Sequence, residues 1–228
     1  VLTTDPDYGV VTLGRSSGEH VWRFERDGFL PVWRRQTLLR GAVRLVPNPR
    51  LVRRSDRLVQ ITSTGTKFIQ DGTGALRLDF QFQQAGDHAA VRLTPVDGQT
   101  LPGLLPQGWS PMGAFWIESV DPALAANVSI RPPGTIAAGD AAALAKWNPG
   151  TVQWEVLSRV TGNGTNAVVR QIRDWGAYAL VVADAGALAP PSVVEGAALP
   201  ASVPPLQPAA VFSAVGTVEP VTSPASRV

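Results

Sequence analysis

Short apolar segments that end at Gly, Pro or Asn dominate this chain, and they constrain its fold more than any other feature. The run from Leu101 to Val182 consists of such segments throughout. Gly and Pro together make up about 18% of the residues, against roughly 12% in an average protein. Because helix interiors tolerate neither residue well, this pattern favours short strands joined by turns.

Strict alternation of apolar and polar residues identifies the clearest strand. The apolar residues at 76, 78, 80 and 82 alternate with Arg77, Asp79 and Gln81, which is typical of a strand with one wet face. Similar patterns predict a set of strands between residues 58 and 183: Leu58–Thr62, Thr66–Gln70, Ala75–Phe82, Ala89–Pro95, Met112–Ser119, Asn127–Arg131, Ala141–Trp147, Gln153–Val160, Asn166–Ile172 and Ala177–Ala183. Gly162–Gly164 predicts a hairpin turn between the strands Gln153–Val160 and Asn166–Ile172. We therefore expect an all-β fold, an antiparallel β-sandwich over 58–183.

Two flanking regions complete the expected organisation. Residues 1–50 form a small β unit with strands at Val10–Leu13, His20–Glu25, Phe29–Trp33 and Leu38–Leu45, and a turn at Arg26–Gly28. Residues 184–228 have few charges and many prolines, which predicts an extended Pro-rich tail. The chain begins at Val1 without a recognisable leader, so we expect an excised segment or a mature fragment.

One apolar strand, Ala209–Val218, is predicted within the tail. Alone it cannot bury its apolar face, so it is either the first strand of a further domain or a strand donated to another domain or subunit. In the second case the contacts with the partner would come from Val211, Phe212, Val215 and Val218.

Composition excludes several classes of function. The chain has no cysteine, which excludes disulfides, thiolate nucleophiles and cysteine-bound zinc. It has no apolar run of about 18 residues, so we expect no membrane insertion. Eleven arginines against six acidic residues lie within residues 1–57. Binding of nucleic acid would also need aromatic residues for base stacking, and only Trp33 lies near the arginine-rich segment. We therefore predict no nucleic-acid binding, and interpret these arginines as a solvated strand face or as partners of acids in the neighbouring domain.

Residues able to do chemistry are scattered. The two histidines, His20 and His88, fall in different units, and Ser110 lies in a motif one residue too long for a nucleophile elbow. Asp71, Asp87 and Asp97 each stand beside Gly, as turn residues do, and Asp79 lies on the polar face of a strand. We therefore predict a protein that is not an enzyme, with no metal and no cofactor.

Five tryptophans leave a binding function open. Trp109, Trp116, Trp147, Trp154 and Trp175 lie on or next to predicted strands, where large aromatic residues usually fill the core. The alternative is a face that stacks on sugar rings, in which Trp109 would contact a glycan or a partner.

The segment Trp22–Arg35 resembles the last strands of a carboxypeptidase-regulatory-like domain, in which a strand, a Gly-aromatic-Leu-Pro turn and a returning strand recur. The resemblance covers roughly 40 residues and lacks the early strands of that family. It implies that such a domain begins upstream of Val1.

A second resemblance covers about 120 residues. The segments that carry it are Gly108–Pro111, Pro132–Gly134, Leu144–Asn148 and Asp174–Val182. In this order they resemble the bacterial form of the β-sandwich found in netrin receptors, ankyrins and zonula-occludens scaffolds, which occurs in large RHS-repeat (YD-repeat) surface proteins. Some relatives cleave themselves at a His-Phe-Ser near the end of this domain; the matching place here begins with Arg173, so no cleavage is implied.

Together these features predict a non-catalytic structural or scaffolding module of a large exported bacterial protein, secreted or on the cell surface. Its partners would be neighbouring domains of the same polypeptide or sister subunits. A glycan- or protein-binding adhesion module, and an assembly linked by the donated C-terminal strand, are the alternatives.

Overall fold

The chain folds into antiparallel β-sheets. The structure, a computed structural model, describes residues 2–5, 10–13, 16–42, 49–82, 87–120, 126–132, 134–137, 140–161, 168–172 and 174–184. Within these ranges every regular element is a strand: β1 (Leu2–Asp5), β2 (Val10–Leu13), β3 (Gly18–Phe24), β4 (Val32–Leu38), β5 (Leu58–Thr62), β6 (Phe68–Gln70), β7 (Arg77–Phe82), β8 (His88–Val96), β9 (Trp109–Ser119), β10 (Ala126–Arg131), β11 (Ala141–Asn148), β12 (Gln153–Thr161), β13 (Val168–Ile172) and β14 (Gly176–Ala183). The predicted all-β class is confirmed.

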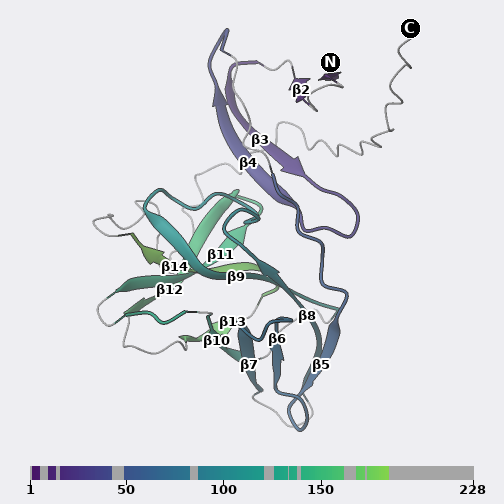
Figure 1. Ribbon diagram of the computed structural model, residues 1–228, viewed down its shortest axis with the longest axis vertical. Coiled ribbons are helices and arrows are strands. Elements are labelled where there is room, and N and C mark those ends of the chain that lie inside the picture. The colour runs from purple at the N-terminus through teal and green to yellow at the C-terminus, as the bar shows by residue number, and fades with distance from the viewer. Residues whose placement is uncertain are drawn as a thin grey trace, which may run out of the picture.

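Two sheets form the sandwich. The larger has six strands in the order β12-β11-β14-β9-β8-β5, and the smaller has four in the order β13-β10-β7-β6. Every described strand pair is antiparallel. Figure 1 shows the smaller sheet facing the larger one, with β5, β6 and β7 at the end of the molecule away from β3 and β4.

The core between the sheets follows from the period-2 pattern. Leu78 and Phe80 of β7 and Ile130 of β10 meet Phe115 and Tyr178 of the larger sheet, and all five are at most 1% exposed. Phe115 and Tyr178 are cross-strand partners in β9 and β14, and their rings stack with centroids 5.5 Å apart. Aromatic cross-strand pairs of this kind stabilise a sheet beyond the area that they bury.

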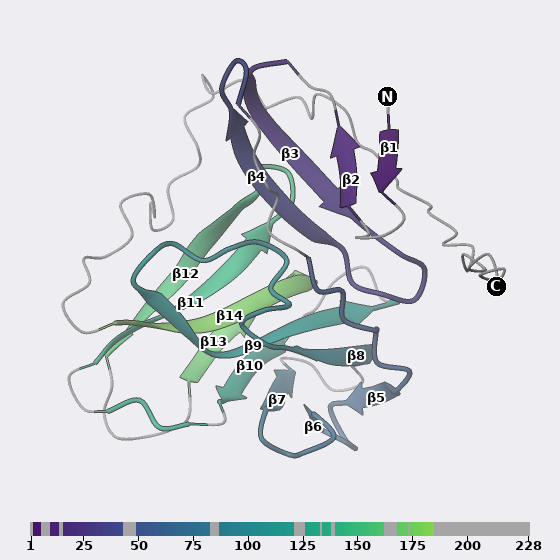
Figure 2. The same ribbon diagram turned by 45° about the horizontal axis from the view of Figure 1, so that its top comes forward.

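Two small antiparallel pairs precede the sandwich. β1 pairs with β2, and β3 pairs with β4 from Gly18↔Leu38 to Phe24↔Val32. Figure 2 shows the β3–β4 hairpin rising from the larger sheet, so that the beginning of β4 lies near the sheet and its end projects away. Burial decreases along β4 in the same direction, since Val32 at its start is 1% exposed whereas Thr37 near its end is exposed.

Most predicted strands match the observed ones to within a few residues, and Leu58–Thr62 matches β5 at both ends. Two predicted strands, Phe29–Trp33 and Leu38–Leu45, are wrong in their bounds. One strand, β4, spans the gap between them, and Ala42 N donates to Leu39 O in a turn after it (3.0 Å). Pro31 limits pairing before β4, because it has no N–H to donate.

The hairpin expected around Gly162–Gly164 is also wrong, although residues 162–167 themselves lie outside the described ranges. β12 pairs with β11, whereas β13 pairs with β10 in the other sheet. The chain therefore changes sheet at this point. Glycine and asparagine specify that the chain turns, but the apolar faces of the two strands decide which sheet each one joins.

Candidate binding cleft

The outer face of the six-stranded sheet is covered, and small residues make this possible. Along the central strands, large residues point into the sandwich and alanines point outward. The outward-facing alanines are Ala114, Ala143, Ala145, Ala177 and Ala179, each at most 5% exposed. Since a methyl group leaves room above the sheet, other parts of the chain pack closely there and form a second hydrophobic core.

Three tryptophans dominate this second core. Trp147 lies between Trp33 of β4 and Trp154 of β12, with ring centroids 5.8 Å and 5.4 Å away. The loop residue Gly103 lies against the ring of Trp147, so closely that a Cβ at this position would overlap the ring atoms Cζ3 and Cη2. Trp154 Nε1 donates to Gly103 O (3.0 Å). The loop is therefore held on the aromatic cluster by shape and by a buried hydrogen bond.

The base of the hairpin is attached to the same loop. Trp33 N donates to Pro102 O at 2.6 Å, in a hydrogen bond outside the β3–β4 ladder. The guanidinium of Arg34 donates to Trp33 O (2.8 Å) and to Leu101 O (3.4 Å). Arg35 Nη2 donates to Thr151 O (2.6 Å). The hairpin base thus contacts both the loop and the turn between β11 and β12.

A strap of residues 50–57 joins the hairpin to the sandwich on another side. Leu30 N donates to Val52 O, and Arg54 N donates to Gly28 O, both at 2.8 Å. Arg54 also forms an ion pair with Glu118 of β9 (3.6 Å). The strap therefore contacts the hairpin loop through its backbone and the larger sheet through a charged side chain.

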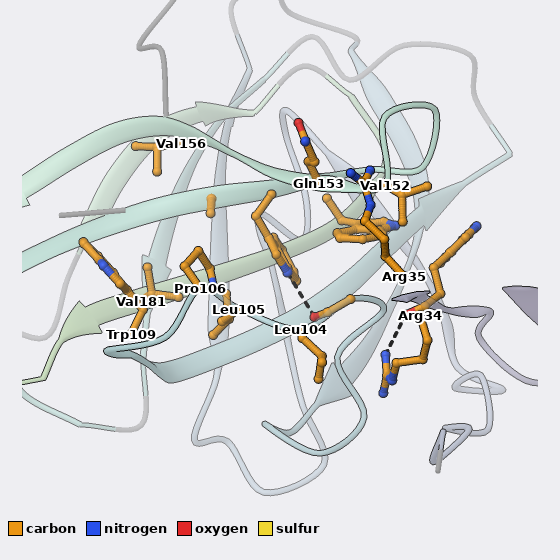
Figure 3. Close-up of a pocket in the computed structure, with 15 residues that line it drawn as sticks. Arg34, Arg35, Leu104, Leu105, Pro106, Trp109, Val152, Gln153, Val156 and Val181 are labelled. Atoms are coloured by element: carbon orange, nitrogen blue, oxygen red, sulfur yellow. Dashed lines mark hydrogen bonds between the residues drawn. The ribbon is translucent and has the colours of Figure 1, made fainter. Parts of the chain in front are cut away.

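An open cleft of about 270 Å³ lies where these parts meet. It is lined by side chains of the hairpin, the loop, and strands β9, β11, β12 and β14. Figure 3 shows Trp109 and Val181 at one end and Arg35 and Val152 at the other, with Leu104 and Pro106 between the ends. A cavity of this size with mainly apolar walls and a few polar groups has the character of a binding site.

The polar end of the cleft carries positive charge. Arg34 is 4% exposed, and burial lowers the pKa of its guanidinium. No ion pair joins Arg34 to an acidic residue of the described ranges, so backbone carbonyls provide its hydrogen-bond partners. Arg35 forms an ion pair with Glu19 (3.1 Å). The charge at this end is therefore only partly compensated by carboxylates in the part of the chain that the structure describes.

Backbone strain occurs at the same end. Val152 has a φ of 54°, in the left-handed region that a β-branched residue rarely adopts. Asn148 Oδ1 accepts hydrogen bonds from Gly150 N (2.8 Å) and Thr151 N (3.3 Å), which tightens the turn just before it. Such strain costs on the order of 1–3 kcal/mol and occurs most often at ligand clamps and active sites.

Two indole groups of the cleft wall lack acceptors. Nε1 of Trp109 and Nε1 of Trp147 are shielded from solvent, and neither has a hydrogen-bond partner among the described residues. An unsatisfied buried donor costs about 1–3 kcal/mol. An occupant of the cleft that carries carbonyl or hydroxyl oxygens would reduce this cost at Trp109, whose half-buried side chain lines the cleft.

A second hollow, of about 300 Å³, lies beside Trp116 and Trp175. Its polar residues already have partners: Lys146 Nζ lies 2.7 Å from Oδ2 of the neighbouring Asp174, and Asn148 donates to Glu155 Oε1 (2.6 Å). It is therefore the weaker candidate for a binding site.

Trp109, the predicted contact residue inside the sandwich, is half-buried and lines the cleft. The other predicted contacts, Val211, Phe212, Val215 and Val218, lie outside the described residues. Trp147 and Trp154 are core residues, 4% and 8% exposed, as their positions in strands predicted; Trp116 and Trp175 are half-buried.

The sequence did not indicate that Arg34 and Arg35 belong to this site. Their expected place on a solvated face is wrong for Arg34, which is buried. The pairing expected between this arginine-rich segment and acids of the neighbouring domain does occur, at Arg54 and Glu118. The apolar stretch Leu30–Trp33, directly before the two arginines, was the sequence feature that could have indicated a buried position.

The acidic residues considered for catalysis have structural contacts. Asp71 accepts from Thr73 Oγ1 and Leu76 N in a turn, and Asp97 accepts from two backbone N–H groups in another. Asp79 forms ion pairs with Arg77 and Arg131. Within the described ranges no group of three or more His, Asp or Glu side chains is placed to hold a metal ion.

No helix with the length and apolar character needed to cross a membrane occurs among the described residues. No family model, curated protein or solved structure matches this chain.

Proposed function

We propose that this chain is a non-catalytic structural module that works as a rigid joint within a large exported bacterial protein. The observation that carries the proposal is the second core, in which the hairpin base, the Leu101–Pro106 loop and the outer face of the six-stranded sheet share buried side chains. A hairpin joined only by a flexible linker would have no such core.

The contacts support rigidity because they join the hairpin to three separate segments of the chain. The loop holds Trp33 by a backbone hydrogen bond, the turn between β11 and β12 holds Arg35, and the strap holds Leu30. Relative motion of hairpin and sandwich would break all three sets and expose the tryptophans to water. Interfaces between domains are usually mobile unless they are large and apolar, so this arrangement favours a fixed angle.

The wider context rests on resemblance. A β-hairpin followed by a β-sandwich is the order that the resemblance to a carboxypeptidase-regulatory-like domain and a netrin-receptor-like sandwich implies. We extend the proposal to the RHS-repeat surface proteins, to a secreted or cell-surface location, and to neighbouring domains or sister subunits as partners.

The absence of cysteine makes a direct test of rigidity practical. Thr37→Cys in the hairpin and Ala75→Cys in the sandwich place two exposed labelling sites at opposite parts of the fold. Electron–electron distance measurements on the spin-labelled full chain should give one narrow distribution. The same pair in a Trp33→Ala background should give a broad one. A broad distribution in the otherwise unchanged chain would contradict the proposal.

A glycan-binding adhesion module is the second candidate, and the half-buried Trp109 in the cleft favours it. Binding on a glycan array that disappears in Trp109→Ala, without loss of folding, would support this role. Assembly through Val211–Val218 remains the third, and deletion of residues 205–228 would abolish concentration-dependent polymers if it operates.

A further inference from the structure

The chain leaves the described fold beside the cleft. Ala183, the last residue of β14, is the register partner of Trp109, which lines the cleft. Asp184 N donates to Gly108 O, and Ser110 Oγ donates to Asp184 Oδ1, both at 2.7 Å. Whatever follows Asp184 therefore starts next to the Trp109 end of the cleft.

The sequence that follows has a composition suited to such a cleft. Residues 185–228 contain eight prolines and three charged residues, and Leu199–Pro208 reads Leu-Pro-Ala-Ser-Val-Pro-Pro-Leu-Gln-Pro. This segment includes a Pro-x-x-Pro sequence, Pro205–Pro208, and carries no charge. Proline-rich segments of this kind favour the polyproline II conformation, and aromatic-lined grooves recognise it because little entropy is lost on docking.

The walls of the cleft match this occupant in two respects. Trp109, Leu104 and Pro106 offer apolar surface for proline rings and for a leucine side chain. A polyproline II segment makes no internal hydrogen bonds, so its carbonyl groups are free to accept. Nε1 of Trp109 has no acceptor among the described residues and belongs to a half-buried side chain of the cleft, so it is suited to such a carbonyl group.

The length of the connection permits docking within one molecule. Residues 185–199 separate the anchored Asp184 from Pro200, and a chain of that length spans roughly 20 Å as a coil. A tether this short gives an effective concentration on the order of millimolar, so even weak intrinsic affinity fills the cleft.

We propose that the tryptophan-lined cleft is the docking site of the chain's own Leu199–Pro208 segment, bound in cis. This docking does not depend on the function proposed above. Its consequence is that the chain leaves the module in a fixed direction, and that a glycan reaches Trp109 only by displacing the tail.

The experiment uses the full chain with ¹⁵N-labelled tryptophan and a spin label at Gln207→Cys. The seven indole N–H signals are followed by NMR, and Trp109→Phe assigns the signal of Trp109. We expect the label to cause loss of the indole signals of the four tryptophans that line the cleft, Trp33, Trp109, Trp147 and Trp154; the rings of Trp33 and Trp154 lie 5.8 Å and 5.4 Å from that of Trp147 and so cannot be spared. The loss should be relieved in Pro204→Ala/Pro205→Ala and retained in the control Pro220→Ala/Pro224→Ala, which removes the same number of prolines outside the segment.

Three results would overturn the proposal. The first is that the label leaves every indole signal unchanged. The second is that spin-labelled chains without ¹⁵N cause the same loss when they are mixed with ¹⁵N chains that carry no spin label, which would show docking between molecules. The third is that a neutral oligosaccharide shifts the Trp109 signal of the full chain without relieving the effect of the label.

Discussion

Replacement of Gly103 by alanine is the sharpest test of how the loop packs on the aromatic cluster. An alanine Cβ would overlap Cζ3 and Cη2 of Trp147 and would lie 3.0 Å from Cε3. Carbon atoms pack best at about 3.5–4.0 Å, so either the loop or the ring has to move by more than 1 Å or so. Trp147 is 4% exposed and lies between two other tryptophans, so it has little room to move.

Two costs follow from that movement. Overpacking of a well-packed core costs about 1–3 kcal/mol. Displacement of the loop also weakens the hydrogen bond from Trp154 Nε1 to Gly103 O, which contributes about 1 kcal/mol. We expect Gly103→Ala to lower the free energy of unfolding by about 3 kcal/mol, which is a decrease in Tm of roughly 6–12 °C for a chain of this size.

The control is Gly72→Ala. A Cβ at Gly72 meets nothing within 4 Å, so denaturant unfolding should show an unchanged or slightly increased stability. Trp147→Phe removes the overlapping ring atoms, and the double variant with Gly103→Ala should therefore be less destabilised than the sum of the single variants by about 1 kcal/mol or more. If the two effects add without coupling, or if Gly103→Ala is as stable as the control, the packing described above is refuted.

Three further predictions concern other contacts. Burial, and secondarily the charge of Asp174, raises the pKa of Tyr178 above its ordinary value near 10. The tyrosine of the unfolded chain therefore ionises first, and the free energy of unfolding falls as the pH rises past about 10. In urea unfolding, Tyr178→Phe should show a smaller fall between about pH 9 and 11 than the unchanged chain, and equal falls would contradict this. Asp97→Ala removes the acceptor for Gln99 N and Thr100 N and should lower the free energy of unfolding by about 1 kcal/mol. Asp97→Asn keeps an acceptor oxygen and should retain most of that stability in thermal melts. Glu118→Gln breaks the half-exposed ion pairs to Arg54 and Arg92 and should cost at most about 1 kcal/mol, a loss that 1 M NaCl reduces; a salt-independent loss would show another cause.

The sandwich was predictable because its strands follow local rules. In β7 each residue faces either the core or solvent, so the alternation of Leu78 and Phe80 with charged neighbours is visible in the sequence. Turns at Asp71 and Asp97 were predictable for the same reason, since an aspartate beside glycine caps its own turn.

The cleft was only partly predictable because it depends on contacts between distant residues. The alanines of β11 and β14 lie in predicted strands, but nothing in the local sequence shows that they form a covered face of the sheet. Arg34 looks like a solvated strand residue until the loop at Leu101, 67 residues away, covers it. Trp109 was predicted as a contact because an aromatic side chain at the end of a strand is able to stack on a ligand.

Hydrogen exchange at single amides tests the shared core most directly. Trp33 N donates to Pro102 O and Leu30 N donates to Val52 O, so both amides report on hairpin docking, whereas Leu180 of the central strand β14 reports on the sandwich. If the hairpin and the sandwich are one cooperative unit, all three amides should exchange with the same free energy of opening. Opening at Trp33 and Leu30 that costs at least about 2 kcal/mol less than opening at Leu180 would show that the hairpin undocks by itself, and would contradict the rigid joint.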